Sequence, residues 1–179
     1  MTDESGPADM LYDGIESLSG WSSLLKDSRQ TGGALESRVG SFISSLLLAV
    51  GEDRNAIAVA GSVSDKGSGF LVVVCHAGIA YADVVGLRHD ADEFRITVFP
   101  FAAVISLSIR TRHNYFGGTK ERARQNGIEV GIEVGEKSIS LQPSPGGTSP
   151  LSNADAVHAA FLAIRDGRAL LPADPRRRG

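Results

Sequence analysis

The chain has 179 residues, of which 42% are hydrophobic and 22% charged, values typical of one soluble globular domain with tails. A formal net charge of −3 argues against nucleic acid or an anionic membrane as a bulk electrostatic partner. The single cysteine, Cys75, excludes an intrachain disulfide, which fits a reducing compartment. The acidic first ten residues lack a secretory signal, and no apolar run approaches the ~20 residues of a membrane span, so we expect a cytoplasmic protein without a transmembrane segment.

Residues 1–32 are rich in Ser, Gly and Asp, and we expect a flexible or loosely docked segment. The spacing of Leu18, Trp21 and Leu25 also allows a short amphipathic helix, although several glycines weaken it. In that alternative the helix docks on the domain or on a partner, with Trp21 as its anchor.

The folded domain is predicted over residues 33–171, and it begins with a helix at 35–50. Apolar residues recur there at helical spacing, with Glu36 and Arg38 off the stripe, and Gly51 ends it. The polar face carries few cations, which favours packing on the domain over lying on a membrane surface.

From Ala56 onward the apolar period changes from 3.6 to 2, which indicates β-strands. Strands are expected at about 56–64, 70–76, 79–85, 94–99, 104–112, 128–134 and 138–142. The clearest half-buried strand follows Val104: Ile105, Leu107 and Ile109 share one face, and serines alternate with them on the other.

A last helix is predicted at 153–168, capped by Ser152 or Asn153, and a basic tail follows at 172–179. Its apolar stripe can cover the open end of a bent sheet. The predicted class is therefore α+β: a seven-stranded antiparallel bent sheet or partly open barrel, with an N-terminal helix and a C-terminal capping helix.

Three stretches carry a resemblance to a known family. They are the helix ending at Val50-Gly51-Glu52 before a strand, the hairpin entered through Gly69-Phe70-Leu71-Val72-Val73, and the link Phe99-Pro100-Phe101-Ala102-Ala103-Val104. These stretches, with four strands, three strands and a closing helix, resemble the bacterial branch of the pleckstrin-homology-like (PH-like) domains over residues 35–170. The resemblance implies a PH-like barrel that serves as a binding or assembly module.

The titratable residues form no recognisable catalytic or metal-binding pattern. Cys75 and His76 are neighbours in a predicted strand, so their side chains point to opposite faces and cannot share a proton. Glu129 and Glu133 lie about 13 Å apart on one strand, beyond the ~5–9.5 Å of a working carboxylate pair. None of the four histidines has ligand spacing to another. The sequence therefore predicts no enzyme, no catalytic residue, no cofactor and no metal site.

The strongest candidate binding segment is the basic stretch at residues 110–126. Its candidate residues are Arg110, Arg112, Tyr115, Phe116, Lys120, Arg122 and Arg124. Three interpretations stay open: a hairpin tip whose charges keep it soluble, an anion site, and a protein contact with the aromatic residues as anchors.

We therefore expect a non-catalytic PH-like module that binds a protein partner or forms a homo-oligomer, through an open strand edge or the 110–126 segment. The alternative is a module that binds an anionic lipid head group or another phosphate-containing ligand through that segment. The acidic pI of about 5.8 argues against nucleic acid.

Overall fold

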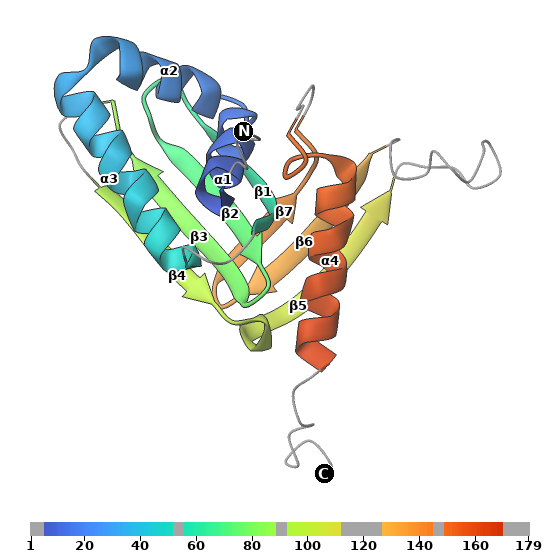
Figure 1. Cartoon of the computed structure of the whole chain (residues 1–179). Helices are drawn as coiled ribbons and strands as arrows, with labels where there is room; N and C mark the ends of the chain where they lie inside the picture. The colour runs from blue at the N-terminus through green and yellow to red at the C-terminus, as the bar shows by residue number, and fades with distance from the viewer. Residues whose placement is uncertain (1–5, 52–55, 89–92, 112–126, 145–148, 170–179) are drawn as a thin grey trace.

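The computed structural model describes residues 6–51, 56–88, 93–111, 127–144 and 149–169 (Figure 1). Its helices are α1 (Pro7–Glu16), α2 (Trp21–Thr31), α3 (Gly33–Val50) and α4 (Ala154–Ala169), with a 3-10 turn, η1 (Phe101–Ala103). Its strands are β1 (Ala56–Val63), β2 (Gly69–Cys75), β3 (Gly78–Val85), β4 (Glu93–Phe99), β5 (Val104–Thr111), β6 (Ile128–Val134) and β7 (Lys137–Leu141). The predicted α+β class is confirmed, and each strand lies close to its predicted position.

The strands form two antiparallel sheets instead of one bent sheet. The first has the order β1-β2-β3-β4 and the second β5-β6-β7, and within the described residues they do not close into a barrel. The prediction of a single partly open barrel is corrected here. The break falls between β4 and β5, where Pro100 has no backbone N–H and η1 turns the chain before β5 begins.

Helices α1, α2 and α3 cover one face of the first sheet (Figure 1). Trp21 is fully buried and stacks on Phe42 at 5.3 Å between ring centroids, and Phe42 meets Phe94 edge-on at 5.4 Å. The expectation of a loosely docked segment at 1–32 is corrected for residues 6–31, which belong to this core. Gly20, one of the glycines that weakened the helical prediction, is where the chain touches β1: a Cβ there would meet the Val63 carbonyl oxygen.

The other face of the same sheet packs on the second sheet and α4. Val72, Val74 and Ile79 from the first sheet share this core with Ile132 of β6 and Ile164 of α4. Because both faces of the first sheet are covered, Leu71 to Cys75 of β2 are all buried, which explains their continuous apolar sequence.

Helix α4 confirms the predicted cap and the predicted apolar stripe. Asn153 Oδ1 accepts a hydrogen bond from the Ala156 amide at 2.9 Å. Val157 and Ile164 are fully buried, while Phe161 is half-buried against the same core. The helix therefore joins the two sheets into one domain.

Helix α3 has a mean hydropathy of 1.2 over 18 residues, enough by length and composition for a membrane span. Core helices of soluble proteins and signal sequences share this property, and 22% of this window is buried. Val39, Phe42, Leu46 and Val50 of α3 are buried in the first core, and Leu48 on the opposite side is 71% exposed.

Candidate interaction surface

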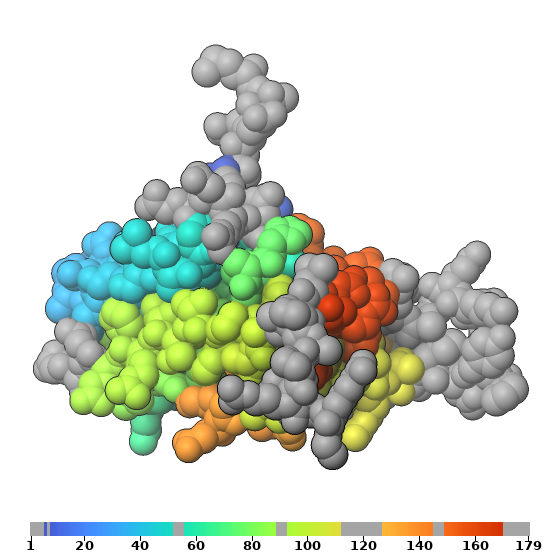
Figure 2. All heavy atoms as spheres, turned by 90° about the horizontal axis from the view of Figure 1, so that it is seen from below, coloured from blue at the N-terminus to red at the C-terminus, as the bar shows by residue number. Residues whose placement is uncertain are grey.

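The edges of the two sheets differ in how they are protected. The β1 edge is covered by irregular backbone: the Val59 amide donates to the Leu151 carbonyl at 2.8 Å and the Val63 amide to the Ser19 carbonyl at 3.3 Å. At the other edge of that sheet, β4 carries exposed Glu93 and Arg95 and lies beside α3 (Figure 2). Charges and covering elements of this kind prevent edge-to-edge pairing.

The other edge of the second sheet is β7, a short strand of five residues. A surface ion pair links it to the first sheet. Lys137 Nζ lies 2.6 Å from Asp83 Oδ2 on β3 and 4.7 Å from the centre of the Tyr81 ring. The hydrogen bond to Asp83 raises the pKa of Lys137, and burial, with Asp83 nearby, raises the pKa of Tyr81. This cluster links β7 of the second sheet to β3 of the first.

The edge at β5 lacks these protections. This eight-residue strand pairs only with β6 among the described strands, and it contains no proline and a single charged residue, Arg110. Ile105 is 65% exposed and Ile109 is 44% exposed. A long strand edge with exposed apolar side chains is a template for pairing with another chain.

The exposure of Ile105 and Ile109 corrects the predicted half-buried face of this strand. The predicted alternation holds from Ser106 onward, since Leu107 and Ile109 lie opposite Ile132 and Val130 of β6, whereas Ile105 falls in the bulge and has no partner on β6. Ile132 and Val130 are buried because β6 is the central strand, whereas β5 projects beyond the core. Periodicity identifies a face of a strand, but it contains no signal for the strand's place in the sheet.

Helix α4 reaches only the beginning of this edge. Arg168 Nη2 donates a hydrogen bond to the Ile105 carbonyl oxygen at 3.3 Å. The bulge between Val104 and Ser106 lies at the same place. From Ser106 to Arg110, the described residues form no backbone hydrogen bond with the strand other than those of the β6 ladder.

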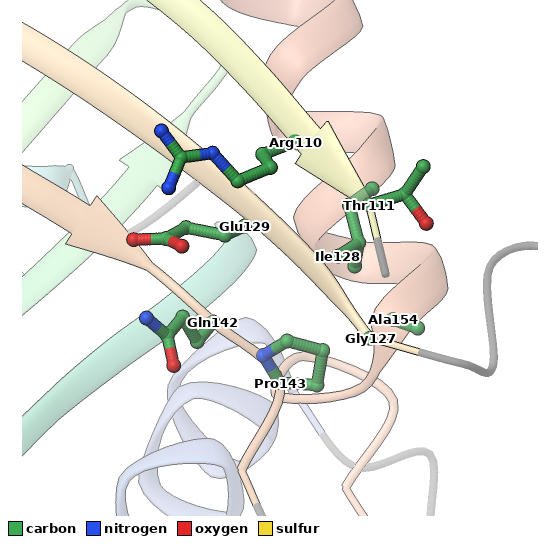
Figure 3. Close-up of a pocket in the computed structure, with 8 residues that line it drawn as sticks. All are labelled: Arg110, Thr111, Gly127, Ile128, Glu129, Gln142, Pro143 and Ala154. Atoms are coloured by element: carbon green, nitrogen blue, oxygen red, sulfur yellow. The ribbon is translucent and has the colours of Figure 1, made fainter. Parts of the chain in front are cut away.

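A pocket of about 330 Å³ lies at the far end of β5 (Figure 3). Arg110 lies opposite Glu129 in the β5–β6 register, and the β6–β7 register places Gln142 beside Glu129. Ser140 Oγ donates to Glu129 Oε1 at 2.9 Å, and Gln142 Nε2 donates to Ser140 Oγ at 3.2 Å. The Glu129 carboxylate faces the same pocket as Arg110, so the pocket lining is polar without being strongly cationic.

Of the predicted binding residues, the structure places only Arg110, at the end of β5. The others, Arg112, Tyr115, Phe116, Lys120, Arg122 and Arg124, lie outside the described residues. An anion site on the 110–126 segment therefore stays a prediction. The sequence predicted binding through this segment or through an open strand edge, but it did not indicate that the exposed apolar edge is β5, immediately before the segment.

The described residues bring together no obvious reactive group. Cys75 is buried with its Sγ 3.4 Å from the Gly78 carbonyl oxygen, and His76 is exposed. Within the described ranges, no three His, Cys, Asp or Glu side chains gather where they could hold a metal ion.

No family model, curated protein or solved structure matches this chain.

Proposed function

We propose that this protein is a non-catalytic assembly module that binds an extended protein segment along β5. The observation that carries the proposal is the β5 edge, where Ile105 and Ile109 are exposed and where no described strand other than β6 pairs with β5. The same proposal includes PH-like architecture. Its support is the succession of four strands, three strands and a closing helix packed against both sheets.

Strand addition would satisfy two needs of this edge at once. An incoming strand supplies partners for the backbone groups that point away from β6, and net gains of roughly 0.5–1.5 kcal/mol per hydrogen bond are typical. It also covers the exposed parts of Ile105 and Ile109. Full burial of an isoleucine contributes about 1.5–3 kcal/mol, so covering half of each gives about 2 kcal/mol for the pair.

The alternation along β5 defines the chemistry of the partner. A strand that pairs here places apolar side chains beside Ile105, Leu107 and Ile109, and small polar side chains beside Ser106 and Ser108. Arg110 disfavours a cation at the end of the partner strand. The expected partner is thus an extended, alternating segment of low charge.

The test uses a peptide with the β5 sequence, Val-Ile-Ser-Leu-Ser-Ile-Arg-Thr, as the probe strand. We expect the peptide to slow hydrogen exchange at amides of residues 106–110 in the full chain. The matched control peptide has alternate backbone amides N-methylated, which removes donors without changing the side chains. Ile109→Lys, which places a charge on the edge, should abolish the effect. Equal protection by both peptides, or no protection by either, would contradict strand addition.

A further inference from the structure

We infer that the strand bound along β5 is β5 of a second copy, so that the two chains form a symmetric dimer with one continuous six-stranded sheet. This inference rests on the proposed function, because it names the partner of that same edge. Two copies related by a two-fold axis perpendicular to the sheet pair their β5 strands antiparallel. The inner faces of both sheets then lie on the same side.

One register of that pairing matches the three apolar residues Ile105, Leu107 and Ile109 with one another. With Leu107 on the axis, Ile105 of each copy lies opposite Ile109 of the other, and Leu107 lies opposite its own equivalent. A two-residue shift to an axis at Ser108 places Ile105 opposite the polar Thr111, and a shift to Ser106 places Ile109 opposite Ala103, outside the strand. The Leu107 register is therefore the one in which both exposed isoleucines are covered by isoleucines.

The polar face accepts the same register. Ser106 of one copy meets Ser108 of the other, and these small side chains fit at the close spacing of paired strands. The two Arg110 residues are offset by six residues along the paired strands, which places them about 20 Å apart. This separation exceeds the ~8 Å screening length of physiological salt. Glu133 of β6, which pairs with Ser106 of β5, is exposed. It lies on the same face as the incoming Arg110 and provides an opposite charge.

The hydrogen bond from Arg168 marks the limit of the pairing. It engages the carbonyl of Ile105, the terminal residue of the paired segment in this register. The paired segment is thus short, from Ile105 to Ile109. Since five residues on each side fall below the ~1,200 Å² of a standard protein interface, we expect a dimer that dissociates on dilution.

The register can be tested with two single-cysteine exchanges in the full chain, Ile105→Cys and Ile109→Cys. When the two variants are mixed and oxidised, we expect at least tenfold more disulfide-linked dimer than from either variant alone. In the Leu107 register, positions 105 and 109 of different copies are directly opposite, whereas identical positions are about 13 Å apart. A disulfide requires Cα atoms within about 7 Å. The wild type is the control for Cys75, which is buried.

A second control is Val98→Cys on the β4 edge, where the residue is 51% exposed. It should form no more cross-linked dimer with either β5 variant than wild type does. Sedimentation should show a reversible dimer that Ile109→Lys weakens at least tenfold without lowering the melting temperature.

Cross-linking that is equal for all pairs, or a wild-type chain that stays monomeric at several hundred micromolar, would overturn the inference. If the β5 peptide still slows exchange at residues 106–110 of that monomeric chain, the proposed strand-binding function stands and only the identity of the partner is wrong. If the peptide also has no effect, both fail.

Discussion

The docking of the N-terminal helices on the first sheet can be tested at Trp21. This side chain is fully buried between α2 and α3, and its ring stacks on Phe42 with an interplanar angle of 15°. Replacement of a buried tryptophan by alanine leaves a large cavity and typically costs about 3–5 kcal/mol, to which the lost ring stacking contributes about 0.5–1.5 kcal/mol. Trp21→Ala should therefore destabilise the domain by roughly 4 kcal/mol.

The indole also provides an internal comparison. Within the described residues, Trp21 Nε1 is buried without a hydrogen-bond partner. Trp21→Phe keeps an aromatic ring against Phe42 and removes that unsatisfied N–H, whose burial costs about 1–3 kcal/mol. We expect Trp21→Phe to be clearly milder than Trp21→Ala.

Thermal unfolding followed by circular dichroism measures both changes. In a domain of this size each kcal/mol corresponds to about 2–4 °C, so Trp21→Ala should lower the melting temperature by about 8–16 °C. The control is Leu48→Ala on the exposed side of α3, which should change it little. Trp21 is the only tryptophan, so its fluorescence should shift to the red at the same transition in the wild type. A measurement error of about 2 °C is expected in such melting temperatures. If Trp21→Ala melted within about that range of the wild type, the N-terminal helices would not be part of the cooperative core.

Two further predictions concern the sheets. Gly69→Ala should destabilise the domain by about 1–3 kcal/mol, because its Cβ would meet the Ser62 backbone carbonyl. Gly131→Ala should be within about 0.5 kcal/mol of wild type, because its Cβ would meet only Ser108 Oγ, at 2.6 Å, which can rotate away. Denaturant titration of both variants measures the two losses, and equal losses would contradict the prediction. The second prediction follows from the raised pKa values of Lys137, through its hydrogen bond to Asp83, and of Tyr81, through burial. A raised pKa in the folded state gives stability that is complete below the unfolded pKa and is lost as the pH rises through the folded one. Melting temperature should therefore fall as the pH rises above about 10, and the small advantage of wild type over Lys137→Met, at most about 1 kcal/mol for an exposed pair, should shrink as the pH rises beyond the ordinary lysine pKa of about 10.4. An advantage that was undiminished at pH 12, well above the ordinary lysine pKa of about 10.4, would show that the ion pair is not its source.

The N-terminal segment shows where local reading of this sequence failed. Glycines at 14, 20, 32 and 33 disfavour helix when each is considered alone. In the folded chain Gly20 provides close approach to β1, and the helices on either side of it bury Ile15 and Leu24, with Leu18 buried in the turn between them. The contacts that stabilise these helices come from residues far along the chain, which no local pattern contains.

The candidate interaction surface shows the complementary limit. Alternation in residues 104–110 identified an apolar and a polar face, and the structure keeps both from Ser106 to Arg110, after the bulge at Ile105. Whether the apolar face is covered depends on the position of the strand within its sheet. Pro100 and η1 separate β5 from β4, so β5 becomes an edge and two of its isoleucines remain in contact with solvent.

Local patterns in the sequence are enough to predict the α+β class, the seven strands with their approximate limits, and the closing helix, because these depend on local periodicity, turn residues and caps. The tertiary structure decided the division into two sheets, the docking of α1 and α2, and the open edge at β5. Each of these depends on which surfaces meet, and burial is settled by packing between segments distant in sequence.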